Sequence, residues 1–519
     1  MTKEKLTEQA RRECCSADTT AHHGGGFGRA FWNAEAFQFM YVPAFQFQPI
    51  SGCKKYRFTA KDENGNTYSF DAPKPSALLT DIWAQLPEGV VELTVRTVND
   101  DNSEGYLVGA RTFYKLAPFN ADLPEAKCSY KECATRAFDY IMNLDYIRYW
   151  LDNGVPDPNY ILNVYPSKTH SSIINAMISY MSLCPEKADD ALKIATNTAD
   201  YLLKITPNDN SPMNGVPPTY QLDYCEVAQE HFKNTVVAER QHTIMMIYPS
   251  YVGKAYLMIE EKTKDKKYLD AAIKIGEFYL NNVLQNGSWY IIIDYAGKPV
   301  SCNYCDPLPN VVPFLMKLYE RTGDEKWKTL SDNAISFVEQ NALMSYNWEG
   351  QFEDSGLSAN YSNLTHFGAA ALVRHYATYY SDDENKMKIA EDLARFIEDQ
   401  FVVWNKPAPW NKDSDDVSLW PVPCALEQYN WYVPIDASSA SAINTFIAMY
   451  KAGRGELYLA KAKALTDTIT RVQHDDGMIP THWMDEKTLN GHNFWINCMI
   501  ATASTVEAMS ELTENNSEK

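Results

Sequence analysis

The sequence predicts a mainly α protein: an (α/α)6 toroid with an N-terminal fibronectin type III-like β-sandwich. Three observations predict this fold class: short period-2 segments near the N-terminus, two alternating kinds of helix after them, and helix connections that alternate between short and long. The expected organisation is a tail with a Gly-rich loop over 1–34, a β-sandwich module over 35–120 and the toroid over 121–519.

The composition is that of an acidic globular chain. The 519 residues are 45% hydrophobic and 22% charged, which is enough to bury a large core. The net charge of −20 argues against nucleic acid and anionic membranes as partners, because both need a basic face. No apolar run is long enough for a membrane span. A small anionic substrate stays compatible, since it needs only a local Arg, Lys or His.

The N-terminal segment and the cysteines set further expectations. The first twelve residues contain no apolar region, so they do not form a signal peptide. We expect a cytoplasmic location if this N-terminus is native, and a periplasmic or secreted one if a leader was removed. The eleven cysteines lack zinc-binding spacing, and neither a metal nor a cofactor is predicted. Phe27, Phe31 and Trp32 make the tail too apolar for a plain linker, which favours contact with a second copy of the chain.

The region from 35 to 117 shows the alternation typical of strands. Its segments are rich in Phe, Tyr, Val and Thr, and turns such as Glu63-Asn64-Gly65-Asn66 separate them. Six short strands in this span predict a small β-sandwich. The expected strands are 36–42, 44–48, 54–61, 67–71, 90–98 and 106–114.

From about residue 125 the chain alternates between outer and inner helices. Outer helices carry Ala, Ile and Leu on one stripe and charged residues on the other, whereas inner helices are apolar on most sides and rich in small residues. The expected outer helices are 126–143, 188–205, 267–284, 327–341, 386–400 and 458–473. The expected inner helices are 170–183, 243–260, 308–321, 364–380, 437–453 and 494–512.

The connections between these helices are asymmetric. Inner-to-outer links are short, and outer-to-inner links are long. In a closed ring all six long connections emerge at the same end, and long loops in compact domains are usually functional. Eight of the twelve tryptophans lie in them, which predicts rings that line a cleft or pack against one another. These are Trp150, Trp289, Trp348, Trp404, Trp410, Trp420, Trp431 and Trp483.

The long connections combine residue types that suit a sugar. Aromatic rings stack on the C–H face of a pyranose, and planar polar groups bind its hydroxyls. Arg240 is expected at the N-terminus of the second inner helix, where it can hold a carboxylate bidentately. The candidate substrate-binding residues are Arg240, His242, Tyr251, Asn363, His366, Trp431, Tyr432, Asp436, His482 and Trp483.

Two reaction classes fit the charged residues. Glycoside hydrolysis needs two carboxyl groups that flank the scissile bond, and Glu239, Glu353, Asp354 and Glu427 are the candidates. Asp436 could also serve, although its position is typical of a helix cap. Uronate β-elimination or C5-epimerisation instead needs a Tyr or His base and a group that neutralises the carboxylate. The candidates for these groups are His242, His366, Tyr248, Tyr251, Asn363 and Arg240. A non-catalytic glycan-binding toroid is the third alternative.

The six-hairpin layout over about 125–513 resembles the (α/α)6 carbohydrate-active enzymes. The front module and the stretch from Leu426-Glu427-Gln428-Tyr429 to Ile435-Asp436-Ala437-Ser438 are similar to the gut-bacterial β-glucuronidases of glycoside hydrolase family 154. This resemblance implies removal of terminal glucuronate from a uronate-containing oligosaccharide. It also implies that Arg240, with nearby His or Tyr, reads the carboxylate while loop carboxylates act as acid and base.

Overall fold

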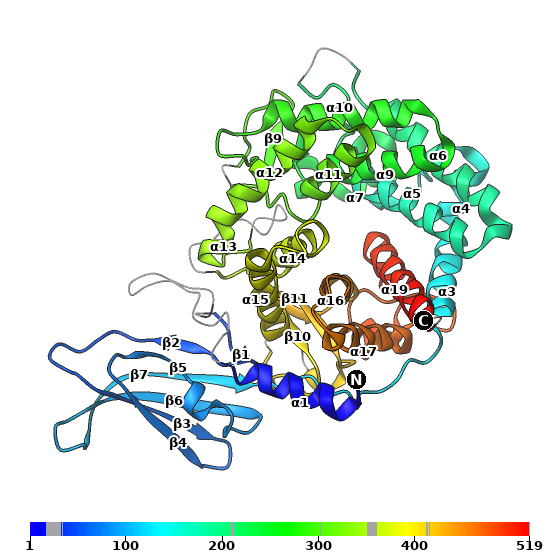
Figure 1. Ribbon diagram of the computed structural model, residues 1–519. Coiled ribbons are helices and arrows are strands. Elements are labelled where there is room, and N and C mark those ends of the chain that lie inside the picture. Colours follow the sequence, from blue (N-terminus) through cyan, green and yellow to red (C-terminus); the bar gives the residue numbers. More distant parts are fainter. Residues whose placement is uncertain are drawn as a thin grey trace.

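The helices of the protein form a ring with a β module at one side (Figure 1). The computed structural model describes residues 1–16, 33, 35–208, 212–301, 303–349, 361–411, 414 and 416–517. Glu353 and Asp354, and the Gly-rich loop at 22–28 with the neighbouring Phe31 and Trp32, lie outside these residues. No helix in the described part is long and apolar enough to cross a membrane.

All twelve predicted ring helices are confirmed. Each inner helix packs against the outer helix that follows it, and the last inner helix packs against the first outer one, which closes the ring. The inner helices are α5 (Pro166–Leu183), α9 (Tyr248–Thr263), α11 (Val311–Thr322), α14 (Phe367–Tyr379), α16 (Asp436–Lys451) and α19 (Ile496–Ser517). The outer helices are α3 (Tyr130–Met142), α6 (Ala188–Ile205), α10 (Lys266–Asn282), α12 (Glu325–Gln340), α15 (Glu384–Phe401) and α17 (Glu456–Val472).

The short inner-to-outer links are built from helix caps. α11 ends at Gly323, whose φ of 69° is left-handed and suits a residue without a Cβ. The next residue, Asp324, caps α12 by accepting a hydrogen bond from the Lys326 amide. Asp265 and Asp383 cap α10 and α15 in the same way. One helix therefore stops and the next begins within a few residues.

The six long connections touch one another in order around the ring. This confirms the prediction that they emerge at one end. The contacts are Gln221 with Val164, β8 (Thr243–Met245) with β9 (Ile292–Asp294), Asp306 with the first turn of α14, Thr365 with Gln428, Ile435 with His482, and Trp495 with Lys168.

Short elements lie within these connections. The fifth connection contains a three-stranded sheet, which presents Glu427 and Trp431 on adjacent strands. The elements are α4 (Asp145–Asn153), α7 (Glu226–Phe232), α8 (Val236–Glu239), α13 (Ala342–Ser345), α18 (Glu486–Asn490), β10 (Val402–Val403), β11 (Cys424–Gln428) and β12 (Trp431–Pro434).

The β module contains the predicted strands in a five-stranded sheet of order β1-β7-β6-β3-β4, beside a two-stranded ribbon of β2 and β5. Phe45 in the ribbon lies 5.4 Å from Phe113 in the sheet, so the ribbon covers the apolar face. Because only this ribbon faces the sheet in the described residues, a full fibronectin-like sandwich stays a prediction. The bounds are β1 (Gln38–Phe39), β2 (Ala44–Gln46), β3 (Tyr56–Asp62), β4 (Thr67–Ala72), β5 (Ser76–Leu78), α2 (Thr80–Trp83), β6 (Gly89–Val98) and β7 (Glu104–Lys115).

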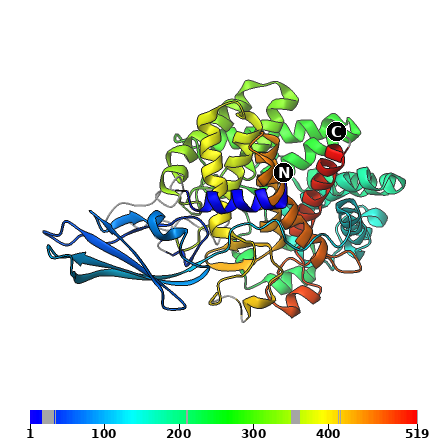
Figure 2. The ribbon, with the colours of Figure 1, turned by 60° about the horizontal axis from the view of Figure 1, so that its bottom comes forward.

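The expected N-terminal tail is wrong for residues 3–14. They form α1 (Lys3–Cys14), which packs along α17 on the wall of the ring (Figure 2). Leu6, Ala10 and Cys14 are buried at a spacing of four residues, which is one stripe of a helix. The surrounding charged residues hid this short stripe in the sequence.

Buried polar contacts fasten the β module to the ring. Asp399 at the end of α15 accepts hydrogen bonds of 2.6 and 2.7 Å from the Met40 and Tyr41 amides. Its neighbour Glu398 forms an ion pair of 2.6 Å with Lys461, and both side chains are 2% exposed. The module is therefore held by specific bonds rather than by a linker alone.

Candidate active site

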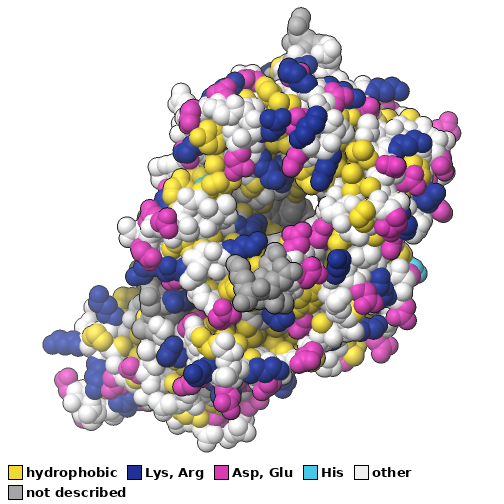
Figure 3. Space-filling view, turned by 45° about the vertical axis from the view of Figure 1, so that its right-hand side comes forward, with side chains coloured by type: hydrophobic (Ala, Val, Ile, Leu, Met, Phe, Trp, Pro, Cys, Tyr) yellow, Lys and Arg dark blue, Asp and Glu magenta, His cyan; other side chains and the backbone are white. Residues whose placement is uncertain are grey.

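The inner helices turn a stripe of partly exposed residues toward the axis of the ring. In α5 these are Lys168, Ser172, Asn175 and Ser179, at helical spacing among buried neighbours. Since the other faces of an inner helix pack against helices, this stripe lines an axial cavity, and Figure 3 shows the surface hollowed near the centre of the view. Matching positions on the other helices include Tyr251, Lys254, Met258, Phe367, Arg374, Asn444, Ala448, Asn497, Ala501 and Ser504.

Asp436 lies fully buried where α16 begins. It is the first helical residue, so the prediction that it is the N-cap is wrong; Ile435 is the cap. Its carboxylate accepts hydrogen bonds from the Ala437 amide at 2.7 Å and the Thr502 hydroxyl at 3.1 Å. Burial raises its pKa well above the usual range, and the negative charge of Glu427 adds to the effect. Its burial therefore favours the protonated form of Asp436.

Glu427 projects from β11 beside Asp436 and is partly exposed. The charges of Asp436, Glu427 and Lys168 affect the pKa of Cys498 on α19. These residues of α5, α16, α19 and the fifth connection therefore meet at the mouth of the cavity. Burial raises the pKa of the Cys498 thiol, which keeps it protonated. Two of the predicted carboxyl residues, Glu427 and Asp436, are thus neighbours.

His366 caps α14 next to the backbone of Glu427 and Ser438. Its two ring nitrogens are buried, and the neighbouring backbone groups of Glu427 and Ser438 partly offset the effect of burial on its pKa. Burial lowers its pKa to about 3, and the positive charge of Arg374 contributes. His366 is therefore a neutral imidazole at physiological pH.

Asp306 is a site residue that the sequence analysis missed. One of its oxygens accepts the Leu308 amide at 3.0 Å, and the other is buried without a hydrogen bond in the described residues. That second oxygen lies so close to Gly368 that a Cβ there would approach it to 2.1 Å. Burial raises the pKa of Asp306 to about 7. Asp306 therefore flanks the first turn of α14 as a carboxyl group that is half protonated near neutral pH.

Tyr251 and Lys254 belong to one hydrogen-bonded cluster with Asn310. Asn310 donates to the Tyr251 hydroxyl at 3.2 Å and accepts from the Lys254 ammonium at 3.1 Å. Burial raises the pKa of Tyr251 to about 12. Of these three residues, the sequence analysis named only Tyr251. A charge in the apolar first three turns of this helix was the signal that could have revealed Lys254.

Two aromatic contacts form the rim of the cup. Trp431 is partly exposed, and its ring lies 4.9 Å from His482, whose ring nitrogen lies 3.4 Å from the Asn493 side chain. Trp495 is 47% exposed and stacks under the Lys168 ammonium at 5.0 Å. Exposed indole at this end suits the stacking of a sugar face.

Other predicted binding residues are structural. Tyr432 is 3% exposed and lies under the β module, where its hydroxyl accepts a hydrogen bond from Gln38. Trp483 is fully buried and donates to the Pro480 carbonyl at 2.7 Å. Asn363 is 8% exposed, and its amide binds the Glu349 carboxylate. Tyr432 and Trp483 are thus buried in structural contacts, and a role for either in substrate binding stays a prediction.

Most loop tryptophans seal the connections against the ring. Six of the eight are at most 5% exposed, so for these six the structure favours packing over an open cleft. The exceptions are Trp410, which is 39% exposed, and Trp431 at the rim.

The second connection differs from the prediction. The inner helix α9 begins at Tyr248 rather than at 243, because Thr243–Met245 pairs with β9. Arg240 consequently precedes a strand and does not lie at a helix N-terminus. Glu239 is exposed at the end of α8, and His242 is exposed with its ring 5.4 Å from Tyr295. The argument for an anion site at the α9 N-terminus is therefore wrong.

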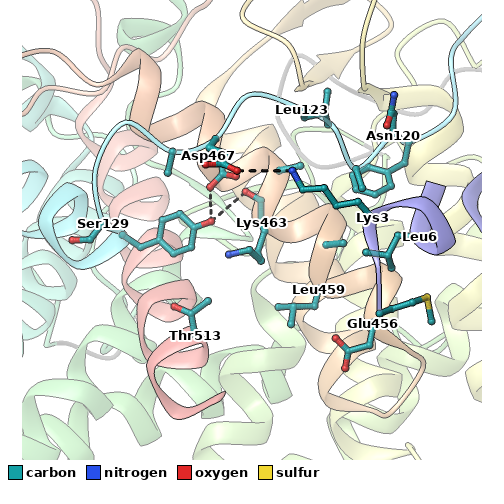
Figure 4. Close-up of a pocket in the computed structure, with 18 of the residues that line it drawn as sticks. Lys3, Leu6, Asn120, Leu123, Ser129, Glu456, Leu459, Lys463, Asp467 and Thr513 are labelled. Atoms are coloured by element: carbon teal, nitrogen blue, oxygen red, sulfur yellow. Dashed lines mark hydrogen bonds and ion pairs between the residues drawn. The ribbon is translucent and has the colours of Figure 1, made fainter. Parts of the chain in front are cut away.

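A separate pocket of about 600 Å³ lies on the outer wall. It is lined by α1, the 119–130 segment, α17 and Thr513 near the end of α19 (Figure 4). Tyr130 donates a hydrogen bond of 2.5 Å to Asp467 beside it. Among the described lining residues none comes from a long connection, so this pocket is not the cup. The described residues also contain no cluster of three or more His, Cys, Asp or Glu suited to a metal.

No protein-family model matches the chain, and no curated protein matches it. Among solved structures, a family 76 glycoside hydrolase from a bovine Bacteroides thetaiotaomicron strain is similar with a TM-score of 0.51 and 10% identity, over 92% of this chain and 98% of that chain. Cellobiose 2-epimerase from Spirochaeta thermophila has a TM-score of 0.49 and 11% identity, over 74% and 97%. Unsaturated glucuronyl hydrolase from Streptococcus agalactiae has a TM-score of 0.45 and 10% identity, over 73% and 90%. The first likeness shows that the fold is shared.

Proposed function

We propose that the protein is a glycoside hydrolase that removes terminal glucuronate from a glycan held in the cup. The observation that carries this proposal is the placement of Asp306 and Glu427 beside the α14 N-terminus. Asp306 lies against Gly368, and the Glu427 backbone lies beside His366, two residues earlier. Two carboxyl residues that meet the same helix end are candidates for the acid and base of glycoside hydrolysis.

The environments of the two carboxyl groups suggest their roles. A glycosidase needs one carboxyl group that keeps its proton and one that is ionised. Asp306, with a pKa of about 7, is the acid that protonates the glycosidic oxygen. Glu427 is partly exposed and is the base or nucleophile. Burial raises the pKa of the neighbouring Asp436, which favours its protonated form and limits the negative charge beside Glu427.

The solved-structure likeness supports a carbohydrate substrate, because the neighbour with a TM-score of 0.51 is a glycoside hydrolase. The choice of glucuronate follows from the resemblance to glycoside hydrolase family 154 in the stretch around Glu427 and Asp436. Trp431 and Trp495 at the rim are suited to stack on a sugar.

Turnover of p-nitrophenyl β-D-glucuronide tests the proposal. Glu427→Gln and Asp306→Asn should each lower kcat by about 100-fold or more, the range typical of a lost acid or base. Glu486→Gln is the matched control, because Glu486 is an exposed carboxylate in the sixth connection. The proposal is wrong if both site variants keep wild-type activity. Glycan retention in affinity electrophoresis without release of reducing sugar would identify a binding protein instead.

One observation favours a uronate lyase or epimerase as the second candidate. Tyr251 lies 5.2 Å from the Lys254 ammonium, a cation that could neutralise a uronate carboxylate while a tyrosine or histidine moves the proton. An acidic polysaccharide distinguishes the reactions, because elimination creates a double bond that absorbs in the ultraviolet. Absorbance growth that Tyr251→Phe abolishes would support this candidate over the hydrolase.

A further inference from the structure

Three cations lie at the same level of the axial cavity, below the carboxyl groups of the mouth. Lys254, Lys317 and Arg374 occupy the second turns of α9, α11 and α14. Burial lowers the pKa of Lys254 to about 7, with contributions from the positive charges of Lys317 and Arg374. Burial also lowers the pKa of Arg374 to about 10. Lys254 and Arg374 are therefore poorly solvated and close enough to influence each other, whereas Lys317 is exposed.

The polar partners of Lys254 and Arg374 are neutral. Lys254 binds Asn310, and Arg374 donates to the Thr445 hydroxyl at 3.3 Å and the Ser441 carbonyl at 3.5 Å. No ion pair joins either cation to a carboxylate within the described residues, which leave out 350–360. Lys461 shows the usual solution for a buried cation, since it pairs with Glu398. An unpaired cation away from bulk water is costly unless a ligand neutralises it.

The side chains of these cations lean toward the mouth. Helical side chains tilt toward the helix N-terminus, and all inner helices begin at the cup. Arg374 accordingly influences the pKa of His366, the cap of α14, and Lys254 reaches Asn310 directly before α11. A ligand group at this level would lie just below Asp306 and Glu427.

We propose that Lys254 and Arg374 form an anion-binding subsite at the floor of the cup, which holds the carboxylate of a uronic acid. The identity of the sugar rests on the proposed function. A carboxylate between the two cations directs the ring upward, with its glycosidic bond toward Asp306 and Glu427. A neutral hexose would leave both cations unpaired, so the subsite selects acidic sugars. In this proposal Lys254 and Arg374, and not Arg240, bind the carboxylate of the sugar.

Calorimetric titration with D-glucuronate and D-glucose tests the subsite without any turnover. The wild-type chain should bind glucuronate at least tenfold more tightly than glucose. Lys254→Met and Arg374→Gln should each weaken glucuronate binding about tenfold and leave glucose binding unchanged, whereas Arg374→Lys should retain part of the preference. Lys262→Met is the matched control, because Lys262 is exposed on the same helix as Lys254.

Thermal unfolding separates binding from a structural role. Removing an unpaired, poorly solvated cation should leave Tm unchanged or raise it. Equal losses for glucuronate and glucose, or unchanged binding in both variants, would overturn the subsite. If Arg374→Gln does not fold, Lys254→Met decides. The calorimetric experiment measures the binding of glucuronate and not its hydrolysis. Inactivity toward the glucuronide substrate would therefore refute the proposed function without contradicting a measured preference for glucuronate over glucose.

Discussion

Asp436 on α16 accepts a hydrogen bond of 3.1 Å from the Thr502 hydroxyl on α19. This bond joins two adjacent inner helices at the mouth of the cavity, directly beside Glu427. Because Asp436 is fully buried, the energy of the bond is not shared with water. The Thr502 hydroxyl thus helps to hold the neighbour of a proposed catalytic carboxylate.

Thr502→Val should lower the free energy of unfolding by about 1–3 kcal/mol, because it leaves a buried oxygen of Asp436 without its donor. Urea denaturation measures this change. Ser504→Ala on the same helix is the control and should change stability by less than about 0.5 kcal/mol, since Ser504 is partly exposed. Equal effects of the two substitutions would contradict the role assigned to Thr502.

Asp306 should set the alkaline limit of activity. A general acid works while protonated, so kcat/KM should fall as the pH rises above about 7, the pKa of Asp306. Asp306→Asn should remove this limb of the pH profile as well as lower the rate. A profile in Asp306→Asn that keeps the wild-type alkaline limb would assign the acid to another group.

Asp399 should make stability depend on pH. Burial raises its pKa to about 7, whereas an unfolded aspartate titrates near about 3.9. The folded chain therefore binds more protons between these values, and its stability from this group falls as the pH rises from about 4 to about 7. Asp399→Asn should show a shallower decline than wild type over that window. Denaturant titrations at several pH values compare the two, and identical slopes would contradict the prediction.

The buried Lys461–Glu398 pair joins α17 to α15 beside the β module, whose Tyr41 hydroxyl donates a hydrogen bond of 2.9 Å to Glu398. Lys461→Met leaves Glu398 charged and buried, which should cost about 3–5 kcal/mol of stability. Lys463→Met is the matched control, because Lys463 is exposed two residues further along α17. Lys461→Met combined with Glu398→Gln should recover part of the loss. No recovery in the double variant would mean that packing, rather than charge, dominates at this junction.

The periodicity of the sequence predicted the ring because each amphipathic helix must bury its apolar stripe locally. The periodicity gave a wrong result where a segment pairs or packs with a part of the chain that is distant in sequence. Thr243–Met245 pairs with Ile292–Asp294 as a strand, so α9 begins at Tyr248 and not at 243. α1 was missed because its three buried residues stand in a charged segment. The role of the loop tryptophans stayed open because composition does not distinguish an indole that seals a loop from one that lines a cleft.

The sequence by itself determined the helix order, the strands of the β module and the end of the ring where the long connections meet, since these follow from local patterning and chain connectivity. Only the tertiary structure decided which charged residues come together at the mouth and in the cavity. Asp306 and Glu427 come from connections far apart in the chain. In the sequence Lys254 and Arg374 look like ordinary helix charges, and only the closed ring shows that they are poorly solvated. Their burial and mutual fields change their pKa values, and both depend on distances that a linear sequence does not contain.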